Sequence, residues 1–155
     1  MKTVLLATIA AIAIAPAAAQ AEKFVGRCKM GECIHYDLLK IRDIESSKPP
    51  IYGTLIEADM MSAVSDSPDT AGLEWDGPHQ IQFFCSGVRP AIQVSDGSFA
   101  ALDLVNISGA TEMVVTMYLQ ACHPGSGAAA GDAESLNYEP TPEGTYSSFD
   151  ELVKG

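Results

Sequence analysis

The four cysteines of this chain, Cys28, Cys33, Cys85 and Cys122, are the residues that could most directly do chemistry. They could form a metal site, a redox centre or a pair of disulfides. A zinc site needs further ligands at regular spacing, and the sequence contains no spaced histidine pair. Thioredoxin-like redox centres and c-type haem attachment both need a C-x-x-C motif, which the sequence lacks. Disulfides are therefore the preferred interpretation.

The first 21 residues support this interpretation, because they have the pattern of a secretory signal peptide. Lys2 supplies the positive charge, residues 4–14 form an apolar run, and residues 17–21 offer cleavage sites, with the preferred cleavage before Glu22. The apolar run is shorter than the roughly 20 residues that a transmembrane helix needs, which disfavours an N-terminal anchor. All four cysteines follow the cleavage site, so we expect export to oxidise them.

Four cysteines can pair in three ways, and we predict Cys28–Cys33 together with Cys85–Cys122. The residues between the first two cysteines, Lys29-Met30-Gly31-Glu32, are typical of a turn, and Gly31 can adopt a positive φ. A loop this short brings two flanking strand residues within disulfide reach. The second disulfide would then close a much longer loop.

The other residue types that could support catalysis form no motif. His35, His79 and His123 are far apart in the sequence, so a site built on them would need the fold to bring them together. Gly125-Ser126-Gly127 lacks the G-x-S-x-G frame of a nucleophilic serine, and the sequence has no glycine-rich phosphate loop. We therefore predict a protein that is not an enzyme and that uses no cofactor and no metal.

The composition is acidic, with 20 Asp and Glu residues against nine Lys and Arg residues and a net charge of −11. Removal of the predicted signal peptide takes away Lys2 and no acidic residue, so the mature charge would be −12. Nucleic acid and anionic membrane surfaces attract basic proteins, and we expect neither as a partner. No later segment is long and apolar enough for membrane insertion. A cationic protein would suit this charge, which can also serve solubility alone.

The segments that would position these residues are predicted to be mainly strands. Residues 33–44 alternate and then slip in phase at Leu39, which predicts a strand with a β-bulge, with a helix as the alternative. Asp96-Gly97 lies between two apolar runs and predicts a hairpin with a two-residue turn, in which Val94 pairs with Phe99. Further strands are predicted over residues 51–58, 79–86 and 91–95, with a long loop over residues 59–78.

The C-terminal third of the chain contains three kinds of segment. Residues 112–122, EMVVTMYLQAC, are apolar on both faces and rich in β-branched residues, which predicts a central strand buried on both sides. Residues 124–143 are rich in Gly, Ala, Pro, Ser and Glu, which is typical of a flexible surface segment. Ser148 and Glu151 have the spacing of a capping box and predict a short terminal helix that docks against the sheet.

Together these elements predict a mainly β fold, either an antiparallel β-sandwich or a small open barrel, with two disulfides and a short C-terminal helix. The chain divides into a removable signal peptide over residues 1–21, a disulfide-stapled β domain over residues 22–123, and a flexible segment over residues 124–155 that ends in the helix. The mature part has the length of one ordinary domain.

A series of motifs runs from C-x4-C, through Phe84-Cys85-Ser86 followed by Pro90, to a predicted strand that ends in Cys122-His123. This order resembles small uncharacterised exported proteins of Proteobacteria, and the similarity covers residues 28–123. Members often have an aromatic residue after the second cysteine, where this chain has Ile34. The resemblance implies export and a disulfide-bonded β fold, and it implies no activity.

The run Ser86, Gly87, Val88 and Arg89 is similar to the Ser-Gly-x-x-Tyr loop of periplasmic c-type lysozyme inhibitors. Those proteins are small β-barrels whose loop enters the lysozyme cleft. The resemblance marks these four residues as a candidate interaction loop with a basic enzyme as its target. Pro90 stands where that family has tyrosine, so the main contact residue is missing.

The sequence therefore predicts a non-enzymatic β domain, periplasmic or secreted, that binds an unknown ligand or associates with the cell envelope. One alternative is an inhibitor of a cationic hydrolase such as lysozyme. The other is a small metal-binding periplasmic protein that uses His35, His79 or His123.

Overall fold

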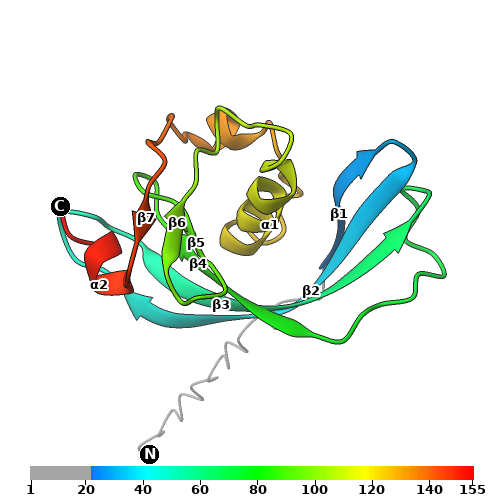
Figure 1. The fold of residues 1–155 in the computed structure, drawn as a ribbon, viewed down its shortest axis with the longest axis horizontal. Coiled ribbons are helices and arrows are strands. Elements are labelled where there is room, and N and C mark those ends of the chain that lie inside the picture. The colour runs from blue at the N-terminus through cyan, green and yellow to red at the C-terminus, as the bar shows by residue number, and fades with distance from the viewer. Residues whose placement is uncertain (1–21) are drawn as a thin grey trace, which may run out of the picture.

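The computed structural model describes residues 22–155, and the predicted signal peptide lies outside these residues. The described chain contains one seven-stranded antiparallel sheet in which each strand pairs with the next along the sequence. The sheet is curved, and helix α1 lies on its concave side (Figure 1). The strands are β1 (Glu22–Lys29), β2 (Glu32–Ser46), β3 (Thr54–Ser65), β4 (His79–Cys85), β5 (Ala91–Gln93), β6 (Phe99–Ala101) and β7 (Thr145–Tyr146). The helices are α1 (Glu112–Cys122), the 3-10 helix η1 (Ala133–Leu136) and α2 (Phe149–Leu152).

Strand β2 is the longest strand, and its pairing with β3 is interrupted by bulges. The first register shift lies between Leu38 and Lys40, which confirms the β-bulge predicted at Leu39. Strand β3 continues to Ser65, so the prediction that a loop begins at Asp59 is wrong. Backbone pairing with β2 extends this strand through residues whose own preference for strands is weak.

The hairpin between β5 and β6 forms at Asp96-Gly97 as predicted, but its loop has three residues instead of two. Val94 N donates to Ser98 O at 2.8 Å, and Gly97 N donates to Val94 O at 2.9 Å. Gly97 has a φ of 86°, as in hairpins where a type I turn precedes a left-handed glycine. Phe99 consequently pairs with Gln93, and the predicted pairing with Val94 is wrong.

Residues 112–122 form helix α1, so the predicted doubly buried strand is wrong. Every residue from Val115 to Ala121 is buried. Such an apolar run fits a strand between two layers as well as it fits a covered helix, because periodicity does not separate the two. The sheet covers one side of α1, and the segment that contains η1 covers another (Figure 1).

The main core lies between α1 and the concave face of the sheet. Its fully buried members include Met60, Phe83, Leu104, Val115, Tyr118 and Leu119. A smaller core lies against α2 and consists of Leu55, Phe84, Ala91, Phe99 and Leu152. The mainly antiparallel β fold with two disulfides is confirmed. Of the two predicted architectures, the single curved sheet corresponds to the open barrel.

Both predicted disulfides are confirmed. Cys28 and Cys33 are direct partners in the β1–β2 pairing, and the loop between these strands is Met30-Gly31, with φ values of 53° and 79°. Positive φ at both residues is the requirement of a two-residue type I′ hairpin. Cys85–Cys122 joins the end of β4 to the last residue of α1 across a Cα–Cα distance of 5.5 Å, so it holds the helix on the sheet.

Residues 124–143, for which the composition suggested a flexible surface segment, pack on α1. Ala128, Ala133 and Tyr138 are buried in the main core. The side chain of Gln120 in α1 donates a hydrogen bond from Nε2 to Ala128 O at 2.6 Å, which ties the backbone of the segment to the helix. These contacts depend on α1, and the composition of the segment contains no sign of them.

The short C-terminal helix α2 begins with the predicted cap. Glu151 N donates to Ser148 Oγ at 3.2 Å, and the Glu151 carboxylate accepts a hydrogen bond from Ser147 N at 2.7 Å. Leu152 is fully buried, and the Phe149 ring meets a core phenylalanine edge to face. The helix is therefore docked as predicted.

Candidate ligand-binding site

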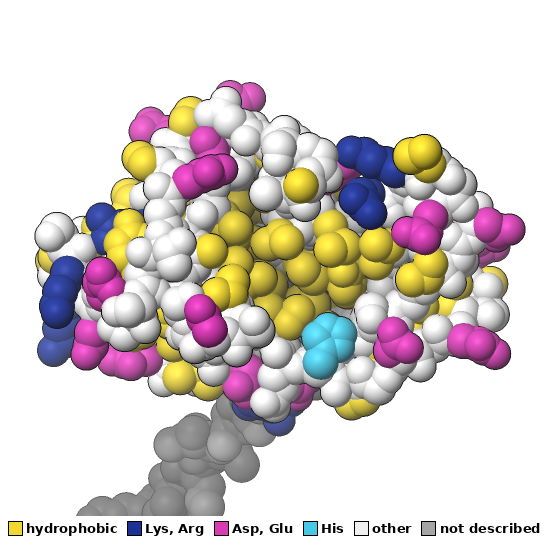
Figure 2. Space-filling model, in the orientation of Figure 1, with side chains coloured by type: hydrophobic (Ala, Val, Ile, Leu, Met, Phe, Trp, Pro, Cys, Tyr) yellow, Lys and Arg dark blue, Asp and Glu magenta, His cyan; other side chains and the backbone are white. Residues whose placement is uncertain are grey.

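An apolar hollow opens between α1 and the β1–β2 end of the sheet, where Figure 2 shows hydrophobic side chains gathered in a recess. We define the apolar hollow by Phe24 of β1, Ile34 and Tyr36 of β2, and Met113 of α1. The Phe24 and Tyr36 rings stack with centroids 5.6 Å apart, and the Tyr36 hydroxyl donates to Met113 Sδ at 2.9 Å. Ile34 and Met113 are only partly buried, so both keep apolar surface open to solvent beside this stack.

Gly26 allows the Tyr36 ring, with Met113 of α1 beside it, to come close to β1 at this hollow. A Cβ atom at Gly26 would lie 2.6 Å from Tyr36 Cε2 and 3.3 Å from Met113 Cγ. The pairing of β1 with β2 also shifts register between Val25 and Arg27, so Gly26 is the residue of a β-bulge. The wall of the hollow therefore depends on a glycine whose lack of a side chain permits the close approach.

A second recess, with a volume of about 300 Å³, lies beside the Cys85–Cys122 disulfide. It brings together three segments that are far apart in the sequence: the turn after β4, the end of α1 and the residues after η1. Its lining residues are Cys85, Ser86, Gly87, Cys122, His123, Leu136, Asn137 and Tyr138. Both sulfurs are oxidised in the disulfide, so this recess offers no thiol.

His123 and Tyr138 form the polar centre of this second recess, with His123 Nε2 and the Tyr138 hydroxyl 2.7 Å apart. Burial lowers the pKa of His123 and raises the pKa of Tyr138. Both shifts favour the neutral forms, so the pair is an uncharged hydrogen bond at neutral pH. This hydrogen bond fixes the segment after η1 to the end of α1.

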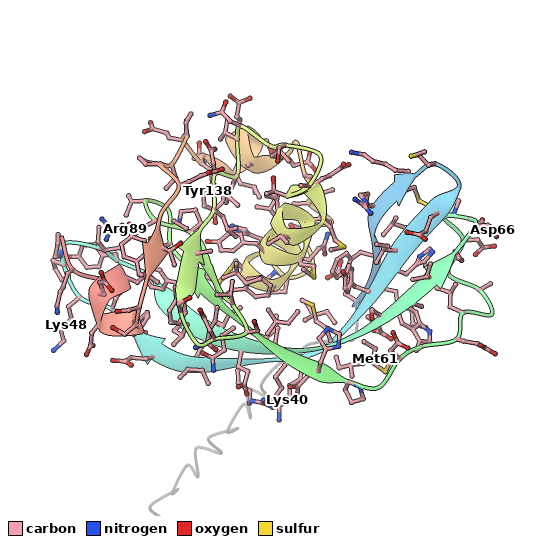
Figure 3. The ribbon with its side chains drawn as sticks, viewed as in Figure 1. Lys40, Lys48, Met61, Asp66, Arg89 and Tyr138 are labelled. Atoms are coloured by element: carbon pink, nitrogen blue, oxygen red, sulfur yellow. A yellow bond between two sulfur atoms is a disulfide. The ribbon has the colours of Figure 1, made fainter. Side chains whose placement is uncertain are left out.

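The candidate interaction loop is held mainly by contacts within the protein. Ser86 is buried, and its hydroxyl donates to Tyr52 O at 2.7 Å. Arg89 Nη1 donates to Leu152 O at 2.6 Å and to Lys154 O at 2.7 Å. Figure 3 shows Arg89 beside α2, at the opposite end of the molecule from β1. Gly87 and Val88 face solvent, and Val88 is 62% exposed.

The fold does not bring the three histidines together. His35 is fully buried. Its Nε2 lies 2.7 Å from Ser65 Oγ and 3.0 Å from Ser67 O, so His35 holds the start of the loop after β3. His79 is exposed at the start of β4, and His123 lies in the second recess. Among residues 22–155, no three His, Cys, Asp or Glu side chains are grouped so that they could hold a metal.

The apolar hollow was not predicted, because the prediction of a strand over residues 112–122 left no helix to form one of its walls. The available signal was the spacing of Met113 and Met117, which are four residues apart and so share one face of a helix. No pattern in the sequence of β1 predicts that this strand forms one side of the hollow. Phe24 and Tyr36 meet only because β1 and β2 pair in the observed register.

Comparison with protein-family models, with curated proteins and with solved structures finds no match for this chain. The described residues themselves define a class of protein: a disulfide-linked antiparallel β domain with an apolar hollow beside one helix. Two disulfides are typical of proteins in an oxidising environment outside the cytoplasm. No helix within residues 22–155 has both the length and the apolar character that crossing a bilayer requires.

Proposed function

We propose that this protein is an exported, non-enzymatic binding module that acts in the periplasm or outside the cell and holds a small apolar molecule in the apolar hollow. The supporting observation is the partly buried pair Ile34 and Met113 beside the Phe24–Tyr36 stack. Ligand sites are typically recessed and lined mainly by apolar and aromatic side chains. A ligand that covers Ile34 and Met113 would remove their remaining apolar surface from water, which stabilises the complex by about 25 cal/mol per Å².

Export is supported by two independent features. The N-terminal sequence has the pattern of a signal peptide, and all four cysteines that follow it are paired in disulfides. The cross-links also explain how the hollow keeps its shape. Cys28–Cys33 closes the hairpin that forms one wall, and Cys85–Cys122 fixes the helix that forms the other.

Titration with the neutral fluorescent probe N-phenyl-1-naphthylamine tests this function on protein purified from the periplasm of an expressing bacterium. We expect saturable binding of one probe per chain. Ile34→Gln places a polar amide in the hollow and should weaken binding roughly tenfold, which corresponds to about 1.4 kcal/mol. Val88→Gln changes an exposed apolar residue outside the hollow and serves as the matched control. Absent binding, or equal loss in both variants, would contradict the proposal.

The alternative function as an inhibitor of a basic hydrolase rests on Val88, the exposed apolar residue of the candidate interaction loop, and on the net charge of −11. Ser86 and Arg89 are occupied by internal hydrogen bonds, so the loop has little else with which to contact an enzyme. A lysozyme activity assay with the wild-type protein and Val88→Gln separates the two functions. Inhibition that depends on Val88 would favour the alternative over the binding module.

A further inference from the structure

Two basic residues of β1 share the concave face with the apolar hollow. Arg27 pairs with Ile34 across the strands, and Lys29 pairs with Glu32. Cross-strand partners point to the same face of a sheet, so the bulge at Gly26 places Arg27 on the side of Ile34. Figure 2 shows two basic side chains at the edge of the recess, although the protein is strongly acidic.

The two cations differ in their partners. Lys29 Nζ lies 2.8 Å from Glu112 Oε2, in an ion pair that joins β1 to the start of α1 and is partly exposed. Arg27 has no ion pair and no side-chain hydrogen bond within residues 22–155. Arg27 lies beside the hollow as the cross-strand partner of Ile34. Burial raises the pKa of the Tyr36 hydroxyl, and the Arg27 guanidinium acts in the opposite direction and lowers it. Arg27 is therefore the cation that an incoming anion would meet beside the Tyr36 ring.

We propose that the ligand of the apolar hollow is a long-chain carboxylate, such as a free fatty acid, whose carboxylate binds Arg27 and whose hydrocarbon chain lies along Ile34, Tyr36 and Met113. This inference rests on the proposed binding function. A guanidinium binds a carboxylate through two parallel hydrogen bonds, which gives orientation as well as affinity. The Lys29–Glu112 pair lies at the same edge and is weak enough, as a partly exposed pair, to rearrange around the ligand.

Charge favours a free amphipathic molecule over a membrane surface. The whole chain carries a net charge of −11, which opposes approach to an anionic bilayer. A single small anion interacts chiefly with the nearest charges, because salt screens charges that are more than about 8 Å away. The hollow also lies in a recess between a helix and a sheet, and the flat surface of a bilayer does not fit into such a recess.

The test is displacement of N-phenyl-1-naphthylamine by dodecanoate and by dodecanol, which share a chain and differ in charge. We expect dodecanoate to bind about tenfold more tightly than dodecanol, in line with the strength of a charge-assisted hydrogen bond. Arg27→Gln should remove that preference while dodecanol affinity stays the same, and Arg27→Lys should restore part of it. Lys40→Gln removes an exposed charge elsewhere on β2 and is the control.

The possible outcomes separate this inference from the function on which it rests. Equal affinity for dodecanoate and dodecanol would overturn the assignment of a carboxylate ligand and leave the apolar binding function standing. Failure of the probe and both chains to bind would overturn both. Binding to vesicles of anionic phospholipid without binding of free dodecanoate would overturn the inference in favour of a membrane surface. A preference for dodecanoate that survives in Arg27→Gln would show that Arg27 is not its anchor.

Discussion

Substitution of Gly26 by alanine should damage both the stability of the protein and the shape of the apolar hollow. The added Cβ would lie 2.6 Å from Tyr36 Cε2 and 2.9 Å from Tyr36 Cδ2. Carbon atoms in favourable contact are about 3.5–4.0 Å apart, so the ring would have to move by about 1 Å. Met113 Cγ, at 3.3 Å from the new atom, blocks part of that movement.

The size of the effect follows from how firmly Tyr36 is held. Tyr36 is 6% exposed, its ring stacks on the Phe24 ring, and its hydroxyl donates a hydrogen bond to Met113 Sδ. Insertion of a carbon into a packed site of this kind costs about 1–3 kcal/mol. We therefore expect Gly26→Ala to lower the free energy of unfolding by about 2 kcal/mol. Binding of N-phenyl-1-naphthylamine should weaken as well, because Tyr36 and Met113 line the hollow.

Urea denaturation followed by circular dichroism measures this loss, with the denaturant slope as a check that the same two states are compared. Gly87→Ala is the control, because nothing lies within 4 Å of the Cβ that it would add. If Gly26→Ala unfolds at the wild-type urea concentration with an unchanged slope, then the Tyr36 ring does not lie over Gly26 as described, and the hollow has a different shape.

Three further results are expected. Replacement of Cys85 and Cys122 by alanine opens a cross-link across 37 residues and should cost about 4 kcal/mol in urea denaturation, against about 2 kcal/mol for the other disulfide, which spans five. Burial lowers the pKa of His123 in the folded state below its ordinary value of 6.5. The stability that neutral His123 contributes is therefore fully present above pH 6.5 and is lost as the pH falls below 6.5 toward the lowered pKa. His123→Gln should show a smaller fall in unfolding free energy than the wild type between about pH 7 and pH 5. Arg89→Gln should lower the free energy of unfolding by about 1–2 kcal/mol and speed hydrogen exchange in α2, because Arg89 donates hydrogen bonds to two carbonyl oxygens near the C-terminus.

Local features of the structure could be predicted because their causes are local. The phase slip at Leu39 became a bulge, since a strand buried on one face must absorb an extra residue somewhere. Gly31 and Gly97 both adopted the left-handed conformation that their turns require. The cap at Ser148 formed because its partner is three residues away. Each of these features needs only a few neighbouring residues.

The two wrong predictions of secondary structure, for residues 112–122 and for the end of β3, also have a common cause. Residues 112–122 form a helix because the curved sheet leaves a concave space for it, and a short apolar run contains no information about that space. Strand β3 extends to Ser65 because β2 is beside it, although its own sequence favours a loop. In both cases, packing against a distant segment outweighed the local preference.

By itself, the sequence determined the antiparallel β class, the pairing of the cysteines, the positions of two hairpin turns and the C-terminal cap. Alternation, glycine positions and short spacings act within one element or between neighbours. Only the tertiary structure decided that α1 occupies the concave face and that an apolar hollow with Arg27 at its edge lies beside it. The hollow joins residues from β1, β2 and α1 that are up to 89 positions apart, from Phe24 to Met113. Such a site exists only after the sheet has curved and the helix has docked.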